Sequence, residues 1–438
     1  MDLNNYDDQG FLGQWRVKAR NSLDKYRGMG IRVLLQNFLS LSVLQAANYL
    51  LPLIILPYLV RMIGVEKLGL IVFAQAVIQY FNIITDYGFH LSATRDIAAN
   101  RNDTSRIAVI FSSVMAIKTV LLVAGFGILL LMVSLFDRFS SDATVYLLTY
   151  GTVLGNYLYP IWFFQGIERM KYITVLSILG RVIYIILLLI FVHQESDYII
   201  VPLLNSIGMV AAGILSMAIA IAKFRVKLRL PPLAAMRDNF KRSSQFFLSR
   251  VAASADSSFN TVILGLFTSN EMVGYFAAAE KLFVAMRNAF MPLVQALYPY
   301  MANRTNVPLF KKVFYVSIAA AVVLSVLMLL LSDVVIGLIF GAGFELSSKI
   351  LRLFSLGVPF MMASILLGYP FLAALGHESY ANYSVAIGSV AHLVLISLLI
   401  PIISPIVVAA AMVFNQLLVL SIRIRGVSKH RLWRLGNP

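Results

Sequence analysis

Residues 107–135 read IAVIFSSVMAIKTVLLVAGFGILLLMVSL, and Lys118 is the single charged residue among them. Because a helix rises about 1.5 Å per residue, this stretch is longer than the roughly 20 residues needed to cross the hydrocarbon core of a bilayer. Similar apolar stretches recur along the whole chain of 438 residues. A backbone in lipid must pair its own polar groups, so these stretches are expected to be helices. The sequence therefore predicts an all-α integral membrane protein.

Composition excludes the other protein classes. Hydrophobic residues make up 60% of the chain and charged residues 13%, whereas soluble domains are about 45–50% apolar and about 25% charged. The same figures exclude disordered and collagen-like chains. The chain has no Cys, so disulfide scaffolds, thiolate metal sites and cysteine nucleophiles are excluded as well.

We expect twelve transmembrane helices in two six-helix lobes around a central cavity. The predicted spans cover about residues 34–60, 69–90, 107–135, 143–164, 172–192, 199–222, 244–267, 272–300, 311–332, 350–372, 380–400 and 404–422. The first span is not expected to be a cleavable signal peptide, because a polar and basic stretch precedes it and no small-residue cleavage site follows.

The basic residues predict the orientation. With twelve spans, loops on the side of the termini contain 26 Lys and Arg residues, and the opposite loops contain 4. The positive-inside rule therefore predicts that both termini are cytoplasmic. The net charge of +16 is then a topology signal that faces anionic lipid, and no nucleic-acid partner is expected.

The longest basic loop divides the chain into two halves. We expect a cytoplasmic N-terminal segment (1–32), an N-lobe (33–222), a basic linker (223–243), a C-lobe (244–422) and a basic cytoplasmic tail (423–438). Residues 66–74 can be laid on residues 271–279 at an offset of 205, with Glu66 on Glu271 and Gly69 on Gly274. This match favours a parallel repeat, in which the substrate binds between the halves. The alternative is two ordinary short turns that each begin a helix with Gly.

Charged groups inside the predicted spans are the candidate functional residues, because each is costly in lipid unless it is paired or hydrated. The basic ones are Lys118, Arg181, Arg250, Lys281, Arg287 and Arg352, and the acidic ones are Asp86, Asp256 and Glu280. A surplus of cations in a hydrated cavity suits an anionic substrate, and Arg suits phosphate oxygens. We therefore predict that Lys118, Arg181, Arg250, Lys281 and Arg287 bind substrate, and that Asp86, Asp256 and Glu280 provide counter-charge or couple an ion.

Polar residues at helical spacing predict the lining of this cavity. Span 2 has one polar face over four helical turns, formed by Gln75, Gln79, Asn82, Asp86 and His90. A polar face of this length is not expected to face lipid. Span 1 contributes Asn48 and span 7 contributes Asn260. Three alternatives remain open, namely that terminal Arg residues snorkel, that acids and bases form structural bridges, and that the polar face pairs helices without a cavity.

Span 4 is rich in aromatic residues. It carries Tyr146, Tyr150, Tyr157, Tyr159 and Trp162. Rings with a hydroxyl group or an indole N–H can contact a sugar, but they can equally form packing contacts or an interfacial belt.

The chain has no phosphate-binding glycine loop and no paired-histidine metal motif. We therefore expect no ATP hydrolysis, no cofactor, no metal and no enzymatic activity.

Several motifs resemble those of bacterial polysaccharide flippases of the Wzx type, in the superfamily that also holds multidrug antiporters and the lipid II flippase. The N-terminal motifs are Tyr58-Leu-Val-Arg61-x-x-Gly64-x-x-x-x-Gly69, Phe73-Ala74, Asp86-Tyr87-Gly88-Phe89 and Ala93-Thr94-Arg95-Asp96-Ile97. The later motifs are Gly274-Tyr275, Glu280-Lys281 and Leu338-Ile339-Phe340-Gly341 with Phe344. The similarity covers about residues 34–420.

The resemblance implies a transporter in the bacterial inner membrane. Its substrate would be an undecaprenyl-pyrophosphate-linked oligosaccharide, an O-antigen unit or a related repeat, moved to the periplasmic leaflet by alternating access. Membrane lipid and other polysaccharide-assembly proteins would be its further partners. The resemblance does not assign roles to the charged residues, which rest on charge and depth alone.

Other functions fit the sequence less well. A cation-coupled multidrug antiporter of the same superfamily is the main alternative, but span 1 has no carboxylate and the interior is net positive. A peptidoglycan-precursor flippase would have two more C-terminal spans. A membrane-embedded polymerase or ligase would need a large periplasmic loop, whereas the longest one expected, about 332–349, is short. A structural scaffold would not need an uncompensated positive interior.

Overall fold

The computed structural model describes residues 43–45, 51–52, 54–254 and 258–434, apart from the side chains of residues 248–254. Within these residues the chain is helical and has no strand, so the predicted all-α class is confirmed. Eight helical stretches in this part are long and apolar enough to cross a membrane. The number of twelve stays a prediction, because span 1 falls mostly outside the described ranges and several other spans are broken into short helices.

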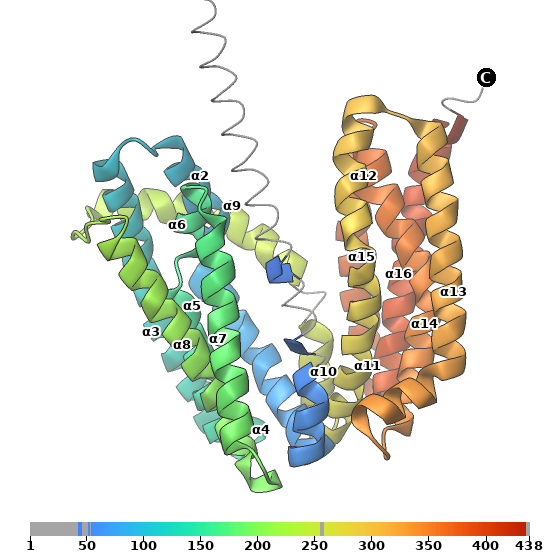
Figure 1. Ribbon diagram of the computed structural model, residues 1–438, viewed down its shortest axis with the longest axis horizontal. Helices are drawn as coiled ribbons and strands as arrows, with labels where there is room; N and C mark the ends of the chain where they lie inside the picture. Colours follow the sequence, from blue (N-terminus) through green and yellow to red (C-terminus); the bar gives the residue numbers. More distant parts are fainter. Residues whose placement is uncertain (1–42, 46–50, 53, 255–257, 435–438) are drawn as a thin grey trace, which may run out of the picture.

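The first half of the chain forms the N-lobe (Figure 1). It consists of a helix over residues 54–86, α2 (Phe89–Ala99), α3 (Thr104–Leu135), α4 (Asp137–Ser140), α5 (Ala143–Leu158), α6 (Ile161–Gly166), α7 (Met170–Phe191), η1 (Glu195–Ile199) and α8 (Ile200–Ala222). The helix over residues 54–86 contains a corner at Gly64, whose φ of 74° is outside helical geometry. This corner separates predicted spans 1 and 2.

The second half forms the C-lobe. It consists of α10 (Phe259–Phe267), α11 (Asn270–Ala289), α12 (Met291–Arg304), α13 (Val307–Phe340), α14 (Glu345–Leu366), η2 (Leu367–Ala373), α15 (Glu378–Leu399), η3 (Ile400–Ile402), α16 (Pro405–Lys429) and η4 (Leu432–Arg434). Helix α9 (Leu233–Ser254) leads from the N-lobe toward α10 (Figure 1). The predicted boundary between linker and C-lobe, at residues 243 and 244, therefore falls inside α9.

Helix α9 is packed on the N-lobe. The ring of Tyr87 lies between those of Phe240 and Phe247, with centroid distances of 4.2 and 4.7 Å. The hydroxyl groups of Ser92 and Ser243 are hydrogen-bonded at 2.7 Å. These contacts involve aromatic and small polar side chains, so they hold the helix without burying a charge.

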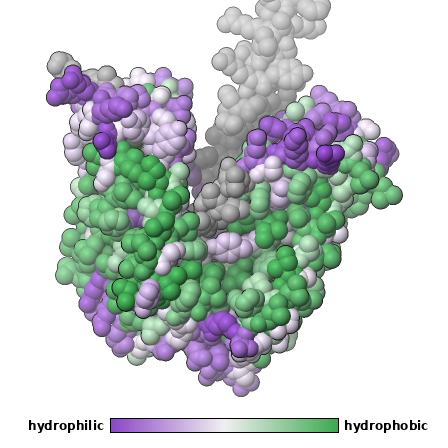
Figure 2. Space-filling view, turned by 180° about the vertical axis from the view of Figure 1, so that it is seen from behind, coloured by the Kyte–Doolittle hydropathy of each residue, from purple (hydrophilic) through white to green (hydrophobic). Residues whose placement is uncertain are grey.

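The two lobes converge at the end that carries α4 and stand apart at the end that carries the C-terminus (Figure 1). The buried core follows this shape. One hydrophobic cluster joins the helix over residues 54–86 to α11 and α14, whereas a second cluster around Phe111 and Trp162 belongs to the N-lobe. Hydrophilic residues gather at both ends of the molecule and hydrophobic ones cover the zone between them (Figure 2). This distribution is that of a multi-pass membrane protein.

Most predicted spans correspond to helices whose ends differ by a few residues, but one prediction was wrong. Helix α13 continues to Phe340, beyond the expected end at residue 332, so the loop expected over 332–349 shrinks to residues 341–344. Asp333 is followed by the apolar residues 334–340, which continue the helix within the hydrophobic zone. The carboxylate of Asp333 forms an ion pair with Arg352 of α14.

Candidate functional site

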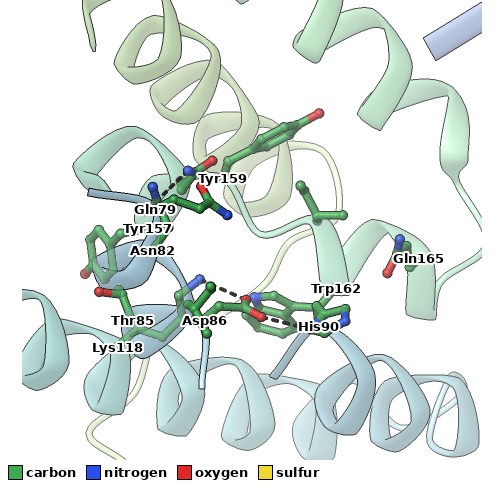
Figure 3. Close-up of a pocket in the computed structure, with 13 residues that line it drawn as sticks. Gln79, Asn82, Thr85, Asp86, His90, Lys118, Tyr157, Tyr159, Trp162 and Gln165 are labelled. Carbon is green, nitrogen blue, oxygen red and sulfur yellow. Dashed lines mark hydrogen bonds and ion pairs between the residues drawn. The ribbon is translucent and has the colours of Figure 1, made fainter. Parts of the chain in front are cut away.

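A cavity of about 220 Å³ lies within the N-lobe (Figure 3). Residues from the helix over 54–86 and from α2, α3, α5 and α6 surround it. Its lining comprises Gln79, Asn82, Ile83, Thr85, Asp86, His90, Lys118, Asn156, Tyr157, Tyr159, Ile161, Trp162 and Gln165. We call it the N-lobe cavity.

The polar face predicted for span 2 supplies one wall. Gln79, Asn82 and Asp86 lie on successive turns of the helix over residues 54–86. This helix ends at Asp86, so the predicted face does not continue unbroken: a turn at Tyr87 and Gly88 follows, and His90 belongs to α2. Gln75, one turn earlier on this face, is exposed and does not line the N-lobe cavity.

Lys118 is paired. Its side chain on α3 is buried, with 3% of its surface exposed, and its Nζ lies 4.0 Å from Asp86 Oδ1. The other carboxylate oxygen of Asp86 is 2.9 Å from His90 Nδ1, as drawn in Figure 3. The carboxylate offsets the ammonium charge, so the cavity is locally close to neutral. The structure therefore places Lys118 beside an acid, although the sequence suggested a cation available to phosphate.

Amide and aromatic side chains complete the lining. The Asn156 Nδ2 group donates a hydrogen bond to Asn82 Oδ1 at 2.6 Å. Two other buried groups, Trp162 Nε1 and Thr85 Oγ1, have no hydrogen-bond partner among the described residues. Buried polar groups are nearly always paired, so these two enclosed atoms are exceptions among the residues around the cavity.

Part of this wall was predicted from the sequence and part was not. Tyr157, Tyr159 and Trp162 were among the aromatic residues noted in span 4, and all three line the cavity. The hydrogen bonds made by Asn156 and the position of Gln165 were not foreseen. A signal existed, since Pro160 breaks the span between α5 and α6, and polar residues beside a helix break often line a cavity.

The remaining tyrosines of span 4 are packing residues. Tyr146 is fully buried in the hydrophobic core. The Tyr150 hydroxyl group donates to the Leu122 carbonyl oxygen at 2.6 Å. For these two positions the packing alternative is confirmed.

Other predicted substrate-binding cations lie elsewhere. Lys281 and Arg287 are exposed on α11, and Arg181 is half-buried on α7. None of these three makes an ion pair with another described residue. Glu280, next to Lys281, is half-buried. The structure thus separates the predicted cations between the two lobes.

The other predicted residues are not at the N-lobe cavity. Asn260 is buried in the C-lobe, where its Oδ1 atom lies 2.8 Å from His392 Nε2 of α15. Asn48, Asp256 and the side chain of Arg250 lie outside the described residues. Within the described residues no group of metal-ligating side chains is gathered.

The C-lobe contains a buried cation that the sequence placed in the cytoplasmic tail. Arg423 is 6% exposed, and its Nε donates to Ser384 Oγ at 2.9 Å. Its Nη1 donates to the backbone carbonyl oxygen of Ser364. The kink at Gly368 and Pro370 follows that carbonyl group. In a continuous helix such a carbonyl oxygen would accept a hydrogen bond from a backbone N–H one turn later. Arg423 therefore links α14, α15 and α16.

The lobes meet through two glycines that the offset of 205 aligned. A Cβ atom added at Gly69 would lie 1.7 Å from the backbone oxygen of Asn270 and 2.7 Å from the nitrogen of Gly274. A Cβ atom added at Gly274 would lie 2.3 Å from the backbone oxygen of Val65. The backbones touch, so only glycine fits at either position. The matching motif places equivalent residues at one crossing between the lobes.

Residues 34–304 match the family described as "Polysaccharide biosynthesis protein". This match covers more than half of the chain. The chain belongs to this family. It is also 32% identical over 334 residues to a protein of Escherichia coli (strain K12) described as "Putative O-antigen transporter", covering 75% of this chain and 80% of that one. The family resemblance expected from the motifs is therefore confirmed.

Solved structures of transporters share the fold. The inward-facing conformation of a multidrug resistance MATE family transporter of the MOP superfamily aligns with a TM-score of 0.66 and 13% identity, over 92% of this chain and 100% of that chain. The lipid II flippase MurJ in an inward closed conformation aligns with a TM-score of 0.64 and 16% identity, over 91% of this chain and 87% of that one. These likenesses support the two-lobed helical architecture.

Proposed function

We propose that the protein is a flippase that moves an undecaprenyl-pyrophosphate-linked oligosaccharide from the cytoplasmic to the periplasmic leaflet of a bacterial inner membrane. Membership of the polysaccharide biosynthesis family supports a role in surface glycan assembly. The relative described as an O-antigen transporter supports transport as that role. We assign no catalytic step to the protein.

The observation that carries the proposal is the tight backbone contact between the lobes at the end that carries α4, whereas the described contact between Gln45 and Gln295 is a side-chain hydrogen bond at 3.5 Å. The Gly69 and Gly274 crossing closes that end, and the lobes stand apart at the other (Figure 1). Alternating access needs this asymmetry, because one barrier must open while the other closes. The positive-inside rule makes the end at which the lobes diverge cytoplasmic, which is the side from which the lipid-linked glycan would enter.

The distribution of charge supports an anionic head group. Helix α11, with exposed Lys281 and Arg287, lies along the edge of the C-lobe that faces the N-lobe (Figure 1). Because neither cation is paired with a described acid, both can contact the diphosphate of the substrate. In the N-lobe, by contrast, Asp86 offsets Lys118. We therefore propose that the diphosphate binds on the α11 side.

Deletion of the gene tests the proposal. The deletion strain should lose surface glycan and accumulate the lipid-linked oligosaccharide on the cytoplasmic leaflet, where a glycosidase added to right-side-out vesicles cannot reach it. Re-expression of the full chain should restore both. Drug sensitivity with normal surface glycan would favour the multidrug antiporter instead.

Charge-neutral variants test the proposed diphosphate contact. Lys281→Gln and Arg287→Gln should each reduce surface glycan at unchanged protein level, because a charge-assisted hydrogen bond contributes about 1.5–3 kcal/mol. Lys349→Gln is the matched control, since Lys349 is also exposed but lies on a different helix, in the first two turns of α14. Wild-type glycan in both test variants would remove the assigned role.

A further inference from the structure

The N-lobe cavity has the size of one sugar ring. Its volume is about 220 Å³, which is the volume that roughly seven water molecules occupy in liquid water at about 30 Å³ each. Sites for drug-sized ligands are larger, about 300–1,000 Å³. A single six-membered ring with its hydroxyl groups suits this space, whereas several linked sugars or a prenyl chain would exceed it.

The charges of the cavity favour a neutral ligand. The ammonium group of Lys118 and the carboxylate of Asp86 are 4.0 Å apart, and Asp86 also contacts His90. A diphosphate placed here would meet the carboxylate as well as the ammonium group, so attraction and repulsion would largely cancel. A hydroxyl group can donate to the carboxylate and accept from the ammonium without that conflict.

The remaining polar groups match hydroxyl chemistry. Gln79, Asn82, Asn156 and Gln165 each carry an amide, which both donates and accepts hydrogen bonds, as a sugar hydroxyl does. The indole N–H of Trp162 and the hydroxyl group of Thr85 are buried and without a partner among the described residues. Trp162 is 1% exposed and Thr85 3% exposed. The four amides therefore match the hydroxyl groups of a sugar, and Trp162 and Thr85 add two enclosed polar groups beside the cavity.

Aromatic rings provide the apolar surface that a sugar also needs. Trp162, Tyr157 and Tyr159 come from α5, α6 and the break between them. Figure 3 shows Tyr159 and Asn82 on one side of the space and Asp86, His90 and Trp162 on the other. Aromatic side chains combine a flat apolar face with a polar edge, and a sugar ring combines a C–H face with a rim of hydroxyl groups.

We propose that the N-lobe cavity is a sugar-binding subsite that receives one uncharged monosaccharide unit of the transported glycan. The proposal rests on the flippase function and deepens it. It divides the head group between the lobes, with the sugar unit at the N-lobe cavity and the diphosphate near Lys281 and Arg287. The residues around the cavity would then select the glycan by its sugar.

Trp162 allows binding at this cavity to be measured directly. The chain has three Trp residues, at positions 15, 162 and 433, so the variant Trp15→Phe/Trp433→Phe leaves Trp162 as the only indole. The purified full chain in detergent is titrated with oligosaccharide released from the cell's own surface glycan by mild acid and freed of phosphate. We expect a saturable change in fluorescence. Inorganic pyrophosphate, titrated in parallel, should leave the fluorescence unchanged.

Variants of the amides locate the binding. In the single-indole background, Asn82→Ala should weaken oligosaccharide binding about tenfold, as expected for one lost hydrogen bond of about 1.4 kcal/mol. Gln79→Ala should have a similar effect, and Gln79 makes no hydrogen bond within the described residues, so its loss should not affect folding. Gln75→Ala is the matched control, because Gln75 is an amide on the same helix outside the cavity.

The outcomes separate this proposal from the flippase function. Fluorescence that does not respond to the oligosaccharide overturns the sugar subsite. So does an affinity in Asn82→Ala and Gln79→Ala that equals the affinity of the single-indole background. A response to pyrophosphate alone would also overturn it and would show an anion site instead. Accumulation of the lipid-linked glycan in the deletion strain supports the flippase function independently. The flippase function is therefore retained even if the binding experiments overturn the sugar subsite.

Discussion

Replacement of Gly69 by Ala tests the contact that closes one end of the molecule. The new Cβ atom would lie 1.7 Å from the backbone oxygen of Asn270, whereas non-bonded heavy atoms prefer about 3.5 Å or more. The gap is short by about 1.8 Å, and the neighbour is backbone, which has no rotamer to change. The helix over residues 54–86 must therefore move away from α11.

The expected size of the effect follows from the packing. Inserting a methyl group into a close-packed contact costs about 1–3 kcal/mol when the surroundings must shift. A change of this size in the equilibrium between closed and open ends corresponds to a factor of about 5–150. Gly69→Ala should therefore open this end in a larger fraction of molecules and leave the lobes themselves folded.

Cysteine labelling measures the opening. The chain has no Cys, so Val273→Cys provides a single thiol at a position that is fully buried on α11. With a membrane-impermeant maleimide added from the periplasmic side, the thiol should react at least about fivefold faster when Gly69→Ala is present. Transport should fall, because the end no longer closes firmly.

A matched glycine variant provides the control. Gly127→Ala on α3 should change neither labelling nor transport, since an added Cβ atom there has no neighbour within 4 Å. Equal labelling of Val273→Cys in the Gly69→Ala and Gly127→Ala backgrounds would refute the reasoning. The lobes would then not be held together by this crossing.

Three further predictions concern ion pairs and hydrogen bonds. Asp86→Asn should destabilise the protein by about 3 kcal/mol, because it leaves buried Lys118 without its carboxylate; the double variant with Lys118→Met should regain thermal stability, and a double variant no more stable than the single one would argue against the pair. The hydrogen bond from Arg101 holds the pKa of the Glu168 carboxyl below its usual value, so the stability it contributes is present above about pH 4.5 and is lost as the pH falls through the lower, folded-state pKa. The melting temperature of Glu168→Gln should consequently vary less than that of wild type on acidification, and parallel curves would contradict the assignment. Arg423→Lys should lower the melting temperature, because an ammonium group cannot reproduce the links to α14 and α15; an unchanged value would show that these links do not stabilise the C-lobe.

The fold class could be predicted because its signal is local. Each span is recognisable from the hydropathy of about 20 neighbouring residues. The break at Pro160 between α5 and α6 was not predicted, since residues 143–164 were expected to form one span. The polar face of span 2 was also visible, since Gln79, Asn82, Asp86 and His90 are close in sequence and follow the helical repeat. Helix identity and helix faces are therefore readable from sequence.

Pairing of charges was less predictable. Lys118 and Arg352 were predicted from the sequence to be cations within the spans. In the structure they form ion pairs with Asp86 and Asp333. Each partner lies on a different helix, so the pairing depends on how two helices are rotated and how closely they approach. Helix α13 exceeded its expected length because the apolar residues 334–340 follow Asp333.

The sequence by itself determined that this chain spans a membrane with helices, that it carries a repeated glycine motif, and that one helix face is polar. The spans and the polar face follow from hydropathy and from a period of 3.6 residues. The glycine motif follows from the match between residues 66–74 and 271–279. Only the tertiary structure decided that Gly69 meets Asn270 and Gly274, that Asn156 and Trp162 join the face of span 2, and that Arg423 is buried. These contacts join residues on different helices, so they depend on helix packing rather than on any local pattern.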